Sequence, residues 1–187
     1  PSAYLDLRVA LVLLAVHEGF SGFSMTSEAA EFMAAIMAPH HLELTDPTGL
    51  FSFDTRFLST WVLTVNGQRL NALSVDDLQY FEARFFLVPG TGTVYVDAKL
   101  SVIRQRAVGD GFHEELTILN HAAEPVELTV RVDADSDFAD LFEVKDALKK
   151  KGTYSTRIDG DGLHLVYERE TFVRMTNIAA SEVSRSL

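Results

Sequence analysis

Alternation of apolar and polar residues limits this chain more than any other feature of its sequence. One alternating segment spans residues 93–102 and the other spans residues 126–135. A period of two is typical of strands with one face on a core and the other in water. The apolar positions are Val94, Val96, Ala98, Leu100, Val102, Val126, Leu128, Val130, Val132 and Ala134. Both segments therefore predict antiparallel sheets.

Turn residues divide the rest of the chain into further strands. Asn66-Gly67 separates residues 61–65 from 68–70, and this dipeptide favours a type I′ hairpin turn. A turn at residues 109–111 joins a strand over 112–120 to the strand before it, and Pro89-Gly90 ends a strand over 80–88. Residues 159–162 form the turn of a hairpin over 158–169. Strands at this spacing predict a mainly β fold, a β-sandwich or barrel, in one domain over residues 1–187.

Three segments lack this alternation. Residues 9–16 are apolar and follow Arg8, but they are too few to cross a bilayer, which takes about 20 residues in a helix. We expect a buried strand there, with a signal peptide as the alternative. Residues 28–37 are helix formers, so residues 24–40 are expected to be a helical insertion. Residues 140–151 begin with acids and end with lysines, the local signals of a second short helix.

Composition excludes several classes of function. The 16 basic and 27 acidic residues give a net charge of −11, which disfavours nucleic acid and anionic membranes as partners. The absence of cysteine excludes disulfides, thiolate zinc sites and a thiol nucleophile, and it fits a reducing compartment such as the cytoplasm. Residues 133–137 have the Asp spacing of a calcium loop, but Phe138 stands where that loop needs glycine. The histidines lack paired zinc spacing, so no metal or cofactor site is expected.

Glu114 is the most unusual single residue. It lies two residues from both Phe112 and Leu116 in a predicted strand, so the three side chains are on the same face. Alternation therefore places the Glu114 carboxylate on the inward face, where an unpaired charge is costly. It either faces a basic partner, lies at a wet end of the sheet, or serves a site. One inward glutamate is not the carboxylate pair that glycoside hydrolysis uses.

Three ordered motifs resemble one family. Residues 49–67 read Gly-Leu-Phe-Ser-Phe-Asp-Thr-Arg-Phe-Leu-Ser-Thr-Trp-Val-Leu-Thr-Val-Asn-Gly. Residues 116–120 read Leu-Thr-Ile-Leu-Asn, and residues 137–144 read Asp-Phe-Ala-Asp-Leu-Phe-Glu-Val. Together they resemble the N-terminal domain of bacterial glycogen-debranching-enzyme-like (amylo-α-1,6-glucosidase-type) proteins. The resemblance covers residues 49–181, and residues before Gly49 depart from the family pattern.

The resemblance implies a supersandwich-type β-sandwich that is not itself an enzyme. In such proteins the catalytic carboxylates lie in a C-terminal (α/α)6 barrel, on which the sandwich packs to help form the α-glucan cleft. The resemblance also implies that residues 141–144 are extended, against the local helix signals. We follow the resemblance for residues 138–144 and leave room for a helical turn after them. The alternatives are a free-standing carbohydrate-binding module and a structural, homo-oligomer-forming sandwich.

The candidates for the cleft edge or for carbohydrate contact are Asp54, Arg56, Trp61 and Glu114. Asp54 and Arg56 lie in an expected loop, where they either pair with each other to anchor the loop or border the cleft. Aromatic rings can stack on sugars. The aromatic candidates are Trp61, Tyr80, Phe81 and Tyr95, and each of them fits a core position equally well.

Overall fold

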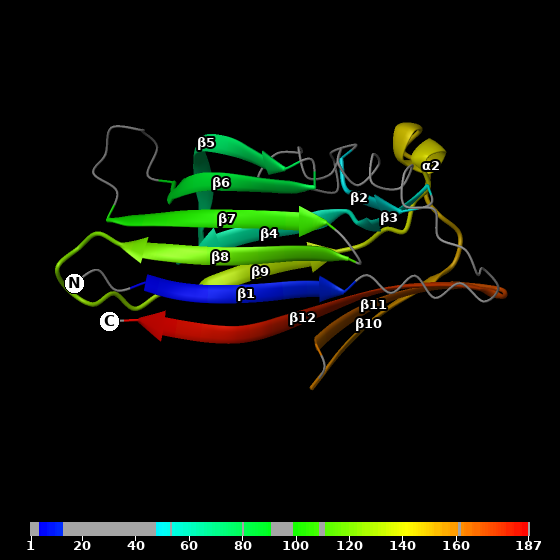
Figure 1. Ribbon diagram of the computed structural model, residues 1–187. Helices are drawn as coiled ribbons and strands as arrows, with labels where there is room; N and C mark the ends of the chain where they lie inside the picture. The colour runs from blue at the N-terminus through cyan, green and yellow to red at the C-terminus, as the bar shows by residue number, and fades with distance from the viewer. Residues whose placement is uncertain are drawn as a thin grey trace.

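The structure is a computed structural model that describes residues 4–12, 48–52, 54–79, 81–90, 99–108, 111–160 and 162–186. These residues form antiparallel strands and one short helix (Figure 1). The helix is α2 (Leu141–Lys145), and the expected helix at residues 28–37 lies outside the described residues. The strands are β1 (Tyr4–Val12), β2 (Leu50–Ser52), β3 (Thr55–Leu58), β4 (Thr60–Val65), β5 (Gln68–Gln79), β6 (Glu82–Pro89), β7 (Leu100–Val108), β8 (Phe112–Asn120), β9 (Val130–Asp135), β10 (Thr153–Asp159), β11 (Gly162–Arg169) and β12 (Phe172–Ser186).

Ten of these strands form one curled sheet in the order β10-β11-β12-β1-β8-β7-β6-β5-β4-β9, and β2 pairs with β3 beside it. The bend lies in β5, whose first residues pair with β4 and whose later residues pair with β6. The sheet therefore doubles back, and β4 and β9 lie behind β7 and β8 (Figure 1). The N-terminal strand β1 lies between β8 and β12, which confirms a strand as far as Val12. Residues 13–16 lie outside the described residues.

Apolar side chains fill the space between the two layers. Leu63 and Val65 of β4 pack with Phe85 of β6 and with Leu116 and Ile118 of β8. A second cluster surrounds Trp61, and a third joins the β3 end of the sandwich to β11. The predicted antiparallel β-sandwich is thus confirmed, with its interior supplied by alternate residues of each strand.

The two alternating segments are confirmed in part. Val102 of β7 is buried, but residues 91–98 lie outside the described residues. In the second segment the strand begins only at Val130, and Val126 is exposed. Its partner strand β4 ends at Val65. The next residue, Asn66, begins the turn, and its side-chain Oδ1 accepts a hydrogen bond from the backbone N–H of Thr129 at 2.8 Å. Alternation therefore continues in the sequence beyond the point where a partner strand exists.

The predicted turns lie where the strand pairing requires them. Asn66 and Gly67 have φ values of 51° and 74°, as a type I′ turn demands. The strand predicted at residues 80–88 is β6, and the strand predicted at 112–120 is β8, paired with β7 as a hairpin. The last hairpin is longer than predicted because β10 begins at Thr153, although its turn still lies between Asp159 and Gly162.

The extended conformation that we preferred for residues 138–144 is wrong over residues 141–144, which belong to a helix, whereas Asp140 before them is extended with φ −79° and ψ 171°. The helix α2 begins after Asp140, whose Oδ1 accepts from the backbone N–H groups of Phe142 at 2.9 Å and Glu143 at 2.8 Å. Glu143 Oε2 in turn accepts from the Asp140 N–H at 2.9 Å, which completes a capping box. The local helix signals were the better guide, although the helix ends at Lys145, well before Lys151.

Candidate functional site

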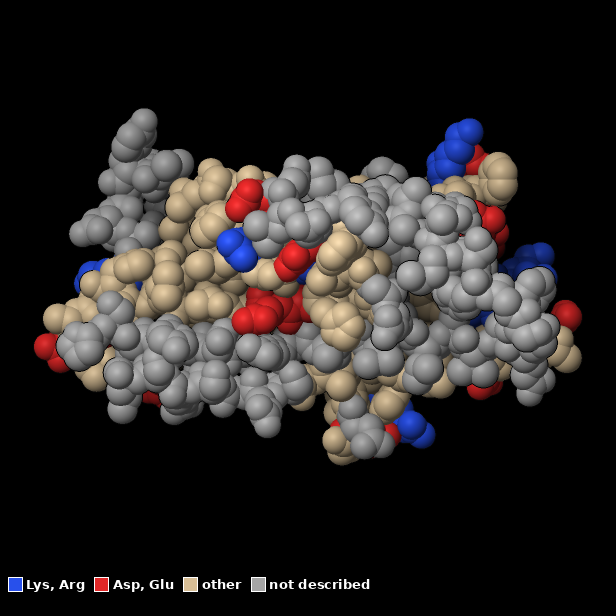
Figure 2. All heavy atoms as spheres, in the orientation of Figure 1, with Lys and Arg blue, Asp and Glu red and all other residues tan. Residues whose placement is uncertain are grey.

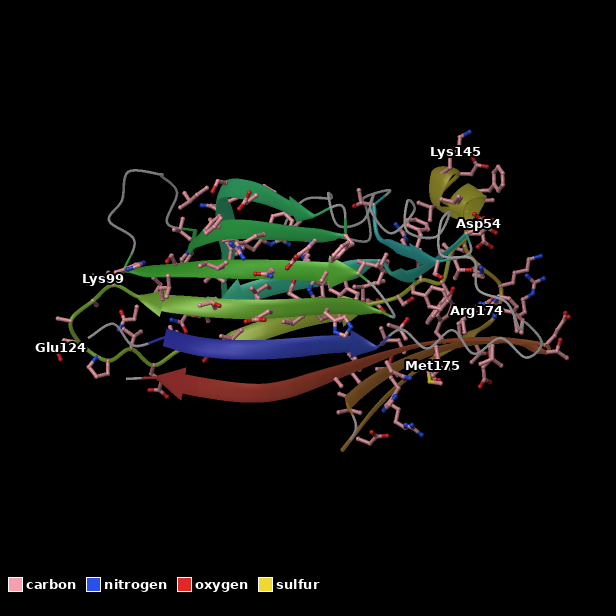
Figure 3. All side chains as sticks on the ribbon, in the orientation of Figure 1. Asp54, Lys99, Glu124, Lys145, Arg174 and Met175 are labelled. Carbon is pink, nitrogen blue, oxygen red and sulfur yellow. The ribbon has the colours of Figure 1, made fainter. Side chains whose placement is uncertain are left out.

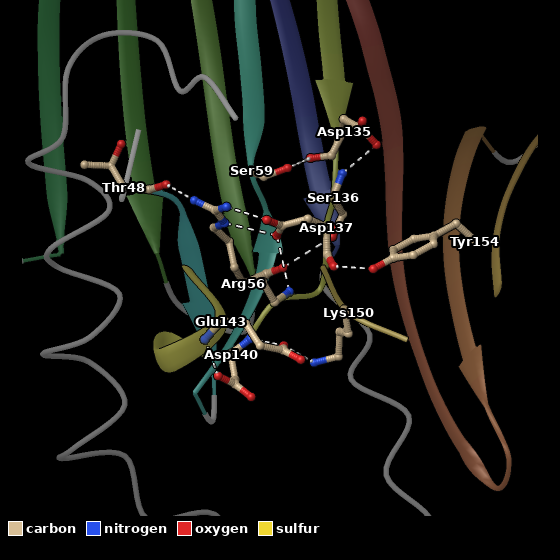
Figure 4. Close-up of polar contacts among 11 residues, drawn as sticks. Thr48, Arg56, Ser59, Asp135, Ser136, Asp137, Asp140, Glu143, Lys150 and Tyr154 are labelled. Atoms are coloured by element: carbon tan, nitrogen blue, oxygen red, sulfur yellow. Dashed lines mark hydrogen bonds and ion pairs between the residues drawn. The ribbon is translucent and has the colours of Figure 1, made fainter. Parts of the chain in front are cut away.

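Arg56 of β3 is the centre of a polar cluster at one end of the sandwich (Figure 4). Its guanidinium is buried and contacts Asp137 through two nitrogens, with Nε donating to Oδ1 at 3.0 Å and Nη2 donating to Oδ2. Nη1 donates to the Thr48 carbonyl at 3.1 Å. A planar guanidinium held at two points by one carboxylate is fixed in orientation as well as in charge.

Asp54 is not the anchor that the sequence suggested. It lies exposed in the β2–β3 turn with a φ of 61°, and the carboxylate facing Arg56 is that of Asp137. The prediction that Asp54 pairs with Arg56 is therefore wrong, because Arg56 pairs with Asp137. The exposed Asp54 is free of the core, whereas Arg56 is part of it.

Gly49 explains the start of the 49–67 motif. A Cβ at this position would lie 2.4 Å from Cδ of Arg56 and 2.7 Å from the Leu58 carbonyl oxygen. Real Cβ atoms do not approach other heavy atoms so closely, so the Arg56 side chain needs glycine beside it. The glycine and the arginine of the motif are therefore one packing unit.

The Arg56 cluster brings two of the family-like motifs together. The backbone N–H of Arg56 donates to the Ala139 carbonyl at 2.8 Å, and Ser136 Oγ donates to the Arg56 carbonyl at 3.3 Å. Thr55 forms an isolated antiparallel bridge with Asp140, the cap of α2. The segment at residues 54–61 therefore lies beside the segment at 137–144, and each holds the other in place.

Side chains beyond α2 complete the cluster. Lys150 Nζ donates to Glu143 Oε2 at 3.0 Å, and the Tyr154 hydroxyl donates to the Asp137 carbonyl at 3.0 Å. The pKa of Tyr154 is raised to about 12, mainly by burial and further by the neighbouring Tyr167 and Asp137. Tyr154 therefore remains a protonated donor at neutral pH, and it ties β10 to the segment that precedes α2.

Glu114 forms a second polar cluster, inside the sandwich. Arg104 Nη2 donates to both of its carboxylate oxygens at 2.8 Å, and Arg106 Nε donates to Oε2 at 2.6 Å. Trp61 Nε1 donates to Oε1 at 2.9 Å. The arginine guanidinium of Arg106 also lies 5.1 Å from the ring centre of Phe85. Of the alternatives left open for Glu114, the structure shows the basic partner.

Electrostatics keep this cluster charged. Burial, the largest single effect, acts to raise the pKa of Glu114, but attraction to Arg104 and Arg106 outweighs it and lowers the pKa to about 2. Burial lowers the pKa of Arg104 to about 10, against the opposing attraction of Glu114. At neutral pH the cluster is ionised. Glu114 is enclosed by its donors, so a substrate cannot reach it in this conformation.

The four predicted site residues thus fall into three places. Trp61 and Glu114 are joined by a hydrogen bond in the interior, and the Trp61 ring is 0% exposed, so no sugar can stack on it in this conformation. Arg56 lies in the other cluster, and Asp54 lies on the surface. Tyr80 and Tyr95 lie outside the described residues. Phe81 is exposed, at a turn before β6.

Sequence reasoning missed three members of these clusters. Arg104 and Arg106 share the parity of Val102 in β7, so extending the alternation would have placed two cations inward. Asp137 belongs both to the calcium-like spacing and to the family-like motif at residues 137–144, but neither pattern indicates an arginine partner. In the structure the three carboxylates of that spacing have separate partners, since Asp133 pairs with Arg131 and the Asp135 Oδ1 accepts from the Ser136 N–H at 2.8 Å.

The described part of the chain contains neither a metal-binding cluster nor a membrane-spanning helix. Within those ranges, no three His, Asp or Glu side chains gather as a group that could hold a metal ion. No helix among the same residues has the length and apolar character needed to cross a membrane.

The fold defines the class of this protein as an antiparallel β-sandwich domain whose buried charged groups pair with one another. Within that class, a family model for the N-terminal domain of (some) glycogen debranching enzymes matches residues 40–186. The match covers most of the chain, so the chain belongs to this family, and the resemblance in the three motifs is confirmed. Comparisons with curated proteins and with solved structures gave no match.

Proposed function

We propose that this chain is the non-catalytic N-terminal domain of a glycogen-debranching-type glycoside hydrolase. In this proposal it packs on the helical-barrel catalytic domain of the parent protein and helps to form the α-glucan cleft, in the cytoplasm. The family match over residues 40–186 is the observation that carries the proposal. The paired, enclosed state of Glu114 supports a domain that supplies shape and not a catalytic carboxylate.

The end of the sandwich that carries α2 is the surface we propose for this packing. Phe142 is 75% exposed, and Leu141 and Leu148 are also exposed, so three large apolar side chains lie in one short segment. Exposed apolar groups that gather in one place mark interaction surfaces more often than scattered ones do. Figure 2 shows basic side chains projecting at this end of a chain that is acidic as a whole.

The α2 segment, residues 140–151, is held firmly although it faces outward. The capping box at Asp140 fixes the start of the helix, and the Lys150–Glu143 ion pair fixes its end. The bridge between Thr55 and Asp140 places the exposed Asp54 beside it, and Figure 3 shows Asp54 and Lys145 at the same end of the molecule. Asp54 is therefore our candidate for the residue that borders the cleft, with Arg56 as its support.

The test uses this chain and the catalytic domain of the parent protein, produced separately and mixed. We expect a complex that changes the hydrolysis of glycogen and pullulan, whereas the chain alone turns over neither. Phe142→Asp should weaken the complex about tenfold or more, because it places a charge in an apolar contact. Val75→Asp, at an exposed apolar position on β5, is the matched control. Hydrolysis by the chain alone, or no complex with the wild-type chain, would contradict the proposal.

A further inference from the structure

β10 is an edge strand with an open side. It lies at one end of the ten-stranded sheet, and β11 is its one neighbour among the described strands. All seven of its residues are exposed. Figure 1 shows β10 and β11 diverging from the body of the sandwich. An open strand edge presents unpaired N–H and C=O groups to any other strand that can align with it.

β10 lacks the devices that protect such edges. Its sequence, Thr-Tyr-Ser-Thr-Arg-Ile-Asp, contains no proline and no lysine, and it pairs with β11 without a bulge. Its one cation and one anion neutralise each other within the strand, since Arg157 Nε lies 3.0 Å from Asp159 Oδ2. The opposite edge of the sheet is more charged, because β9 has three charged residues among six, and the pairing of Arg131 with Asp133 leaves the charge of Asp135 in excess.

The hairpin register shows which backbone groups face outward. Asp159 and Gly162 flank a two-residue turn, and the residues that flank such a turn exchange backbone hydrogen bonds with each other. In an antiparallel pair, bonded and non-bonded positions alternate. The N–H and C=O groups of Tyr154, Thr156 and Ile158 consequently point to the open edge.

We propose that β10 pairs with β10 of a second copy of this chain, antiparallel and about a twofold axis at Thr156. This register aligns all seven residues and uses the outward groups of Tyr154, Thr156 and Ile158 from both copies. Tyr154 lies opposite Ile158 of the second copy, and Thr156 lies opposite Thr156. Aromatic–β-branched and Thr–Thr pairs are favourable cross-strand pairs. A self-complementary patch is what a twofold interface requires.

Side chains are already arranged for this contact. The Tyr154 hydroxyl is bound to the Asp137 carbonyl at 3.0 Å, and its ring centre lies 5.0 Å from that of Tyr167. Ile158 is 78% exposed, so it gains apolar contact when Tyr154 of the second copy covers it. Arg157 lies opposite Ser155 and Asp159 lies opposite Thr153, so no like charges face each other directly.

The net charge of −11 opposes association, and salt screens that repulsion. The pairing should therefore strengthen as salt rises from about 0.05 to 0.5 M, unlike a contact held by ion pairs. It uses β10 and not the α2 segment, so it stands apart from the proposed packing on a catalytic domain.

Analytical ultracentrifugation of the 187-residue chain tests the pairing. We expect the wild-type chain to dimerise, and Thr156→Glu and Thr156→Lys each to weaken dimerisation by about tenfold or more, because like charges then meet on the axis. An equimolar mixture of the two variants should form the dimer again. Thr156→Val, which keeps the β-branched shape, should dimerise as the wild type does.

Each opposing result overturns the proposal. A wild-type chain that stays monomeric up to about 1 mM has no such interface. A dimer that persists in Thr156→Glu uses another surface. If the mixture fails to associate while circular dichroism shows both variants folded, the axis does not pass through Thr156.

Discussion

The variant Glu114→Gln tests whether charge holds the interior cluster together. It keeps the shape of the side chain and removes its negative charge, while Arg104 and Arg106 stay buried beside it. The glutamate accepts from Trp61 at 2.9 Å, from Arg104 at 2.8 Å and from Arg106 at 2.6 Å. A glutamine has one acceptor oxygen and a donating NH2 group, so one guanidinium would face a donor.

Two independent figures give the size of the effect. Removing one partner from a buried ion pair costs about 3–5 kcal/mol. The pKa of Glu114 is lowered from an ordinary 4.5 to about 2, as burial acting upward is outweighed by the two arginines. That lowering corresponds to about 3 kcal/mol of preference for the ionised form. We therefore expect Glu114→Gln to reduce the free energy of unfolding by about 3–5 kcal/mol.

Urea unfolding at pH 7, followed by the fluorescence of the single tryptophan, Trp61, measures this loss. The control is Glu168→Gln, at an exposed position of β11, with an expected change below about 1 kcal/mol. A loss below about 1 kcal/mol for Glu114→Gln as well would refute the reasoning. Because the folded pKa lies below the unfolded one, the stabilisation is present above about pH 4.5 and declines toward pH 2. The deficit of the variant should shrink over that range.

Three further changes probe other parts of the molecule. Asp137→Asn removes the charge that holds Arg56 at two points and should lower the free energy of unfolding by about 2 kcal/mol in urea, with amide exchange increasing in α2. Hydrogen bonds to Asn177 and then Asp159 raise the pKa of His164. The contribution of His164 to the free energy of unfolding should be full below about pH 6.5 and disappear as pH rises through the higher folded pKa. An NMR titration measures this pKa, and unfolding of His164→Gln at several pH values measures the contribution. Gly162→Ala places a Cβ 2.1 Å from the Ile178 carbonyl oxygen at a φ of 133° and should cost more than about 1 kcal/mol of stability. Gly160→Ala, with nothing within 4 Å, should leave the midpoint of thermal unfolding nearly unchanged.

Much of the fold could be predicted because its signals are local. The Asn66-Gly67 turn and the alternation in β8 depend on neighbouring residues alone. The course of β5 was not predicted, since residues 71–76 are all exposed and show no inward face. Yet β5 is the strand that carries the sheet from one layer to the other. The extended conformation predicted for the α2 residues failed for a different reason. There the family resemblance was preferred over a local signal, and the local capping box decided the structure.

The candidate site was harder to predict, because its contacts join distant parts of the chain. Arg56 and Asp137 are 81 positions apart, and no periodicity connects two residues across that distance. Nearer partners were within reach, because Glu114 and the two β7 arginines all have inward parity in adjacent strands. The inward glutamate was recognised from parity, and its cations lie 8 and 10 positions before it.

The central place of β1 has a consequence for biosynthesis. A ribosome adds about 5–20 residues per second, so β1 emerges roughly 10–30 s before β12, its partner on one side, is complete. Throughout that interval the apolar residues at the start of the chain have no finished sheet to enter. β1 then pairs with β8 on one side and with β12 on the other, so among the described strands the last in sequence completes a contact of the first. Nascent chains of this domain should accordingly depend on chaperones until translation has passed β12.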